Sequence, residues 1–179
     1  AHLNEYFNYL NTENSLNEKS IQLTVSVGGD FFTEIAKLRA LRKLVNLLSD
    51  SYQSKNPIYL HAQTTMLNKS EKDAYTNLLR STTEAMSAVI GGANSLSLAG
   101  FDEPYSIANE FSSRMAINQQ HILKDESYLN KVADMAAGSY YIEQLTDQLA
   151  HQAWEKFKEL EAKDGFIAGI ESGSIQQRI

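Results

Sequence analysis

The side chains with the clearest capacity for chemistry lie in the segment Tyr59–Thr65. If this segment is a β-strand, Tyr59, His61 and Gln63 share one face, and the opposite face is aliphatic (Ile58, Leu60 and Ala62). An imidazole can exchange protons near neutral pH, and an amide can orient a polar ligand. At the C-terminal end of a barrel strand, such groups indicate a ligand site. The residues alone leave open whether His61 serves that site or makes a structural hydrogen bond.

A second candidate pair is Asp102-Glu103, just past a predicted strand at 94–99. Carboxylates at that place are well positioned to contact a ligand. The alternative is that Asp102 caps the next helix and Glu103 lies in its first turn, where the helix dipole favours negative charge. From the residues alone, the capping interpretation is preferred.

Other sites are harder to find in the sequence. It contains no phosphate-binding loop, dinucleotide fingerprint, zinc-protease motif or nucleophile elbow. His2, His121 and His151 fall in helical patterns without ligand-spaced partners, so we expect surface or packing roles and no metal site.

Composition restricts the partners. With 22 acidic and 16 basic residues, the net charge is −6 and the sequence pI about 5.2, which argues against nucleic acid as a partner and against an anionic membrane surface. No apolar run approaches the roughly 18 residues of a membrane span. The absence of cysteine favours a reducing compartment, so we expect a cytoplasmic protein.

Periodicity predicts elements that would position these residues. Strands are predicted at 21–27, 59–65 and 94–99, with a short fourth at 132–136. Helices are predicted at 1–12, 31–52, 70–90, 112–124 and from 140 to about 164, the third opened by a capping box of Ser70 and Asp73. This alternation is typical of parallel strands joined by right-handed crossovers.

Three predicted strands share an aliphatic face and a face of small or polar side chains. The polar sets are Gln22/Thr24/Ser26, Tyr59/His61/Gln63 and Ser95/Ser97/Ala99. A doubly wound sheet needs two apolar faces, whereas a barrel packs only its outer face on helices. A closed eight-stranded barrel takes roughly 250 residues. We therefore predict an α/β fold, the second half of a (β/α)8 TIM barrel with about four parallel strands and an N-terminal helix, filling residues 1–179 as one partial domain.

From about Phe31 onward, the sequence resembles the cobalamin-dependent methylmalonyl-CoA mutases. The ordered matching segments are Phe31–Ala40, His61–Thr64, Asp73–Asn77, Arg80–Thr82, Glu84–Met86, Gly92–Leu96, Phe101–Glu103, Arg114–Gln120, Gly138–Glu143 and Leu145–Thr146. The resemblance implies a barrel threaded by the CoA arm of the substrate. It also implies a separate flavodoxin-like domain that binds cobalamin through an Asp-x-His-x-x-Gly motif, and this sequence contains no such motif.

Only some of the family's site residues have a match in this sequence. His61 and Gln63 match a strand-end His-x-Gln that faces the reaction centre and the corrin, and Glu103 matches a Glu that reaches the adenosyl ribose. Catalytic members carry different residues at several other positions: Ser-Gly-Trp for Thr65-Met66-Leu67, His-Thr-Asn for Ser97-Leu98-Ala99, Pro-Trp-Gly-Gly-Ser for Met135–Ser139, and a substrate-holding basic residue in place of Ser20 or Gln22.

A retained scaffold with altered ligand-facing positions is typical of a non-catalytic paralogue. The resemblance thus implies the small, silent subunit of a heterodimer whose large subunit uses adenosylcobalamin to isomerise (R)-methylmalonyl-CoA to succinyl-CoA. We expect no cofactor binding by this chain alone. One alternative is an active acyl-CoA mutase of altered specificity using His61, Gln63 and Glu103. Another is a barrel enzyme doing acid–base chemistry with His61 and Glu103.

Expected partners are the large subunit and the remaining half of the barrel. Because a half barrel exposes two strand edges, we also expect self-association.

Overall fold

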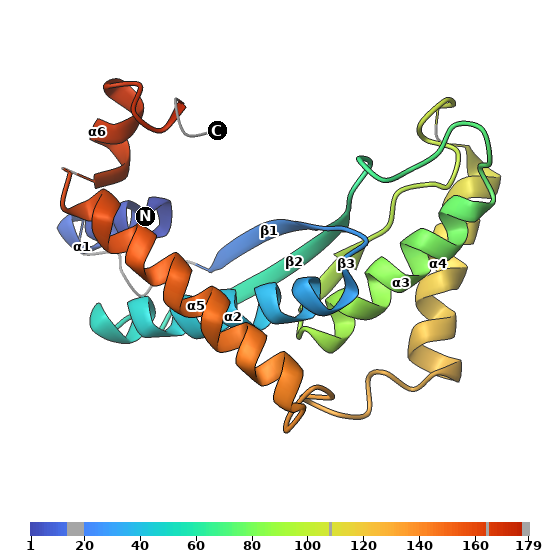
Figure 1. The fold of residues 1–179 in the computed structure, drawn as a ribbon, viewed down its shortest axis with the longest axis horizontal. Helices are drawn as coiled ribbons and strands as arrows, with labels where there is room; N and C mark the ends of the chain where they lie inside the picture. The colour runs from blue at the N-terminus through green and yellow to red at the C-terminus, as the bar shows by residue number, and fades with distance from the viewer. Residues whose placement is uncertain (14–19, 108, 164, 177–179) are drawn as a thin grey trace.

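The structure is a computed structural model that describes residues 1–13, 20–107, 109–163 and 165–176. Strands and helices alternate through most of the chain, and a long helix near its C-terminal end (orange) crosses in front of the helix that follows the first strand (Figure 1). The elements are α1 (His2–Thr12), β1 (Ile21–Val27), α2 (Phe31–Ser51), β2 (Ile58–Thr64), α3 (Thr76–Ile90), β3 (Ser95–Ser97), α4 (Glu110–His121), the π-helical turn η1 (Ile122–Glu126), α5 (Tyr140–Glu161) and α6 (Gly165–Glu171).

The three strands form one parallel sheet in the order β1-β2-β3. In this register Thr24 of β1 pairs with His61 of β2, and His61 pairs with Ser95 of β3. Ser26, Gln63 and Ser97 form the next row in the same way. The predicted parallel α/β arrangement is confirmed for three strands, and it is the arrangement expected for part of a barrel.

The sheet has one covered and one open face. A buried cluster joins the aliphatic sides of β1 and β2 to α2 and α3 through Val27, Leu38, Leu60, Ala62 and Ala88. On the other face, the polar side chains of β1 and β3 are exposed, and Tyr59 of β2 retains 47% of its surface. The predicted division into an aliphatic and a polar face is confirmed, and within the described residues α2 and α3 pack on the aliphatic face.

The predicted fourth strand at 132–136 is wrong, because this segment forms turns and bends. Asp134 is the reason: its Oδ1 accepts a hydrogen bond from the Ala136 amide (3.2 Å) and forms an ion pair with Arg39 of α2. Ala136 then packs with Ile35 and Ile142, between α2 and α5. The segment is thereby fixed against α2 and α5 and makes no pairing with β3.

Helix α5 packs along α2, and ion pairs cross their contact. Arg39 donates to Glu143 Oε1 at 2.7 Å, and Lys43 donates to Asp147 Oδ1 at 2.7 Å. Burial acts to lower the pKa of Arg39, but hydrogen bonds to Asp134 and Glu143 outweigh it and raise the pKa. Through Asp134, Arg39 ties the segment before α5 to α2.

The predicted capping box of Ser70 and Asp73 is also wrong, because α3 begins only at Thr76. The Ser70 amide instead donates to the side chain of Asn77 (2.9 Å), and Asp73 accepts from the Thr76 hydroxyl. Residues 65–75 thus form a connection without regular structure.

Within the described ranges, no helix is both long and apolar enough to cross a membrane.

Candidate functional site

The candidate site lies along the C-terminal edge of the sheet. Because the strands are parallel, the loops that follow them emerge at this one edge: residues 28–30 after β1, 65–75 after β2 and 98–107 after β3. The edges of β2 and β3 are joined where the Thr64 hydroxyl oxygen accepts from the Ala99 amide at 3.0 Å. This is the edge at which barrel proteins place their sites.

His61 is held by its neighbour on β3. Its Nδ1 lies 2.8 Å from Ser95 Oγ, and its side chain is half-buried on the open face. Gln63 stands two residues further along the same face and is exposed. The structure brings His61 and Gln63 onto one polar surface, as the sequence predicted.

The Glu103 carboxylate is hydrogen-bonded within its own loop. Its Oε1 accepts a hydrogen bond from the Gly100 amide at 3.2 Å, which turns the carboxylate back toward the end of β3. No hydrogen bond or ion pair joins Glu103 to His61 or Gln63 within the described residues. The three family-matched side chains therefore lie at one edge but do not form a bonded set.

Asp102 does not cap α4, contrary to the preferred interpretation of the sequence. The N-cap is Asn109, whose Oδ1 accepts from the amides of Phe111 and Ser112, both at 3.0 Å. Asp102 is buried and contributes to the cap indirectly, because its Oδ2 accepts a hydrogen bond from Asn109 Nδ2 at 2.5 Å. Asp102 thus orients the residue that caps the helix.

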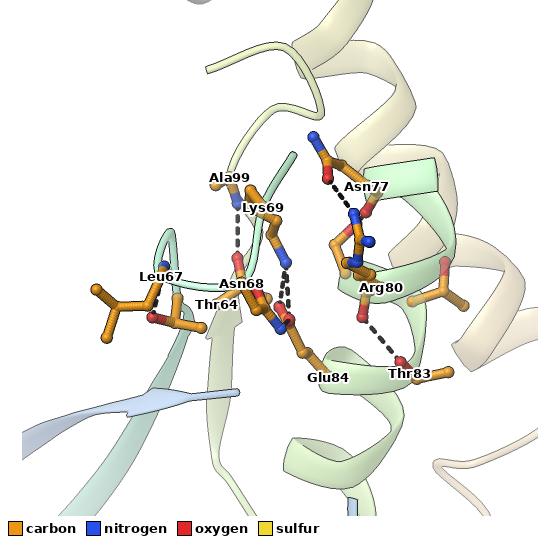
Figure 2. A network of polar contacts seen from close by, with 12 residues as sticks. Thr64, Leu67, Asn68, Lys69, Asn77, Arg80, Thr83, Glu84 and Ala99 are labelled. Carbon is orange, nitrogen blue, oxygen red and sulfur yellow. Dashed lines mark hydrogen bonds and ion pairs between the residues drawn. The ribbon is translucent and has the colours of Figure 1, made fainter. Parts of the chain in front are cut away.

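A buried ion pair under the loop after β2 was missed by the sequence analysis. Lys69 Nζ lies 2.7 Å from Glu84 Oε1 and 2.6 Å from Oε2, and the two side chains are 2% and 0% exposed. Asn68 Nδ2 donates to the same Oε1 at 2.6 Å. Figure 2 shows Lys69 and Asn68 converging from the loop on Glu84 of α3. A glutamate on the buried stripe of a predicted helix is the signal that could have revealed this pair.

Asn77 fastens two of the loops to α3. It accepts from the Ser70 amide, donates to the carbonyls of Ser70 and Phe101, and accepts from Arg80, all at 2.9 Å. Its side chain is fully buried, and Figure 2 shows its contact with Arg80. The loops after β2 and β3 therefore share one anchor.

The edge offers hydrogen-bonding groups and no metal-binding cluster. Among the described residues, no three His, Cys, Asp or Glu side chains gather as metal ligands. A cleft of about 600 Å³ opens elsewhere, beside the N-terminal end of β3, where Arg39, Lys43 and Arg42 line it. Arg39 and Lys43 are paired with carboxylates, and Arg42 donates to Gly92 O and Asn94 Oδ1, both at 2.7 Å. This cleft is apart from the candidate site.

The structure is an α/β domain in which three parallel strands alternate with helices, an arrangement consistent with part of a barrel domain. The family model described as methylmalonyl-CoA mutase matches residues 15–179. The chain belongs to the methylmalonyl-CoA mutase family. The predicted resemblance is confirmed.

Relatives of several kinds match the chain. A methylmalonyl-CoA mutase small subunit of Porphyromonas gingivalis is 42% identical over 164 residues, covering 89% of this chain and 26% of the relative. The large subunit from the same organism is 37% identical, covering 86% and 22%. A methylmalonyl-CoA mutase of Cereibacter sphaeroides is 40% identical, covering 86% and 22%. The chain thus spans about a quarter of the length of these relatives.

Proposed function

We propose that this chain is part of the small, catalytically silent subunit of an adenosylcobalamin-dependent methylmalonyl-CoA mutase. In that role it supports a large subunit that isomerises (R)-methylmalonyl-CoA to succinyl-CoA. The observation that carries the proposal is the altered strand edge. Where catalytic members have Gly-Trp, Met66 and Leu67 follow β2, and Leu67 is 98% exposed. A small subunit is among the relatives that match, although identity alone does not separate it from catalytic mutases.

The geometry of Glu103 supports the same conclusion. In the family this position reaches the ribose of the adenosyl group, but here the carboxylate is bonded to the Gly100 amide. Of the three matched residues, only His61 and Gln63 stand on the open face. The described residues therefore do not fit adenosylcobalamin as a set.

The open edges of the sheet support the proposed partners. Among the described residues, the outer edges of β1 and β3 have no neighbouring strand, so further strands can pair with them, and one outer carbonyl of β1, Ser26 O, accepts from Lys37 Nζ at 2.7 Å. We propose that the rest of the barrel covers these edges in the complete subunit. Without it, residues 1–179 should self-associate, and a monodisperse monomer in light scattering would contradict this.

The proposed lack of catalytic activity is tested with the complete subunit that contains this chain, with and without its large subunit. Titration with adenosylcobalamin, followed by absorbance, should show no binding to the small subunit alone. Binding and turnover of (R)-methylmalonyl-CoA should appear when the large subunit is added. Cofactor binding or turnover by the small subunit alone would refute the proposal.

The second candidate is an active acyl-CoA mutase of altered specificity. The shared polar face of His61 and Gln63 favours it. It predicts a radical signal in electron paramagnetic resonance when the complete protein, adenosylcobalamin and a suitable acyl-CoA are mixed, and loss of that signal in His61→Ala. Acid–base chemistry by His61 and Glu103 has less support, because no hydrogen bond joins the two side chains within the described residues.

A further inference from the structure

The hydrogen bond between His61 and Ser95 joins the central strand to an edge strand at the candidate site. The two residues are direct partners in the register of β2 and β3, and their side chains meet at 2.8 Å on the open face. Only Nδ1 of the imidazole takes part. Among the described residues, Nε2 has no hydrogen-bond partner, and it is not one of the side-chain atoms sealed from solvent.

A neutral imidazole has one nitrogen that donates and one that accepts, and the hydrogen bond at one nitrogen selects the role of the other. A serine hydroxyl can donate or accept. The neutral histidine side chain intrinsically favours the proton on Nε2, and a hydroxyl that donates to Nδ1 reinforces this form.

We propose that Ser95 is a positioning residue for His61: its hydroxyl donates to Nδ1 and so holds Nε2–H as a donor on the open face of the sheet. The ligand group that fits such a donor is an acceptor oxygen, such as a carbonyl. This arrangement is set by β2 and β3 alone, so it does not depend on whether the subunit is catalytically silent.

The strand provides a matched control. Ser97 lies two residues further along β3 on the same face, opposite Gln63, and its side chain makes no hydrogen bond in the described residues. Ser95→Ala removes the hydroxyl that is hydrogen-bonded to His61, whereas Ser97→Ala removes a hydroxyl that has no hydrogen-bond partner among the described residues. Ser95→Thr retains a hydroxyl and suits a strand, so it serves as the rescue variant.

The tautomer of His61 can be read by NMR of the chain labelled with 15N-histidine, with the resonance assigned by its absence in His61→Gln. Spectra are taken at about pH 8.5, roughly two units above the ordinary histidine pKa. Wild type and Ser95→Thr should show the proton on Nε2. In Ser95→Ala the tautomer ratio should fall roughly 2- to 12-fold, the change that a net hydrogen bond of about 0.5–1.5 kcal/mol gives at an RT of about 0.59 kcal/mol. Ser97→Ala should match wild type.

Two results would overturn the inference. A wild-type spectrum with the proton on Nδ1 would mean that Ser95 accepts rather than donates. An unchanged tautomer ratio in Ser95→Ala would mean that the hydroxyl does not select the tautomer. Amide spectra of each variant show whether the sheet is intact, so a folding defect is recognised separately.

Discussion

Replacing Lys69 by methionine should strongly destabilise the protein, because it leaves the Glu84 carboxylate buried without a cation. In the wild type, both carboxylate oxygens of Glu84 accept hydrogen bonds from Lys69 Nζ, at 2.7 and 2.6 Å. In the variant, only Asn68 would remain as a donor to Glu84. The Glu84 side chain is 0% exposed, so water cannot replace the ammonium without opening the loop. Removing one member of such a pair costs about 3–5 kcal/mol.

An exposed pair supplies the matched control. Lys43 and Asp147 meet at a similar distance, 2.7 Å, but their side chains are 63% and 68% exposed. Lys43→Met should therefore cost no more than about 1 kcal/mol. The double variant Lys69→Met/Glu84→Met should recover most of the loss, because replacing both charges by apolar groups of similar volume is often nearly neutral.

Urea unfolding followed by circular dichroism gives the free energy of unfolding of each variant. Repeating it in about 1 M salt separates the two pairs, because salt screens exposed charges and leaves buried ones largely unscreened. If Lys69→Met costs no more than Lys43→Met, or if the double variant is as unstable as Lys69→Met, the Lys69–Glu84 pair does not anchor the loop.

Three further predictions concern other contacts. Asn77→Leu should lower the free energy of unfolding by about 1–3 kcal/mol and speed amide hydrogen exchange in the loops after β2 and β3, because it removes their shared buried anchor. Burial raises the pKa of Tyr52, and the charges of Glu161 and Glu5 raise it further. The neutral Tyr52 side chain therefore contributes fully to stability below about pH 10, and this contribution is lost as the pH rises through the folded-state pKa. Thermal unfolding of Tyr52→Phe should consequently show a weaker alkaline decline than wild type; an equal decline would exclude Tyr52 as the cause. Arg39→Met should lower stability by about 1 kcal/mol or less, with most of the loss suppressed by salt, because its two acidic partners are half-exposed.

Local periodicity was sufficient to predict the elements with one buried face. β1 occupies the predicted residues Ile21–Val27, and α2 ends one residue before its predicted limit. In these segments the aliphatic residues repeat at the period of the element, and tertiary packing agrees with the pattern. β2 starts at Ile58 rather than Tyr59, a shift of one residue.

The errors arise where a side-chain contact outside the short sequence pattern determines the local structure. The segment 132–136 was predicted as a strand, but Arg39, far away in the sequence, binds Asp134. Ser70 and Asp73 have the spacing of a capping box, yet Asn77 takes the Ser70 amide. In both cases a specific side-chain contact overrides a local preference that is worth little energy by itself.

The site could be predicted only in part. The alternation in β2 was enough to place His61 and Gln63 on one face, because strand geometry fixes that relation. The direction of the Glu103 carboxylate depends on the backbone course around Gly100, which no short pattern encodes. The Lys69–Glu84 pair required knowledge of which loop lies against the buried face of α3.

The division of the sheet into two faces also bears on how such a protein can change over evolutionary time. The cluster that stabilises the fold uses the aliphatic side chains of β1 and β2, while the open face contributes little buried surface. Substitutions on the open face therefore cost little folding free energy. A gene copy released from catalytic selection can lose its chemistry there while its product still folds and assembles.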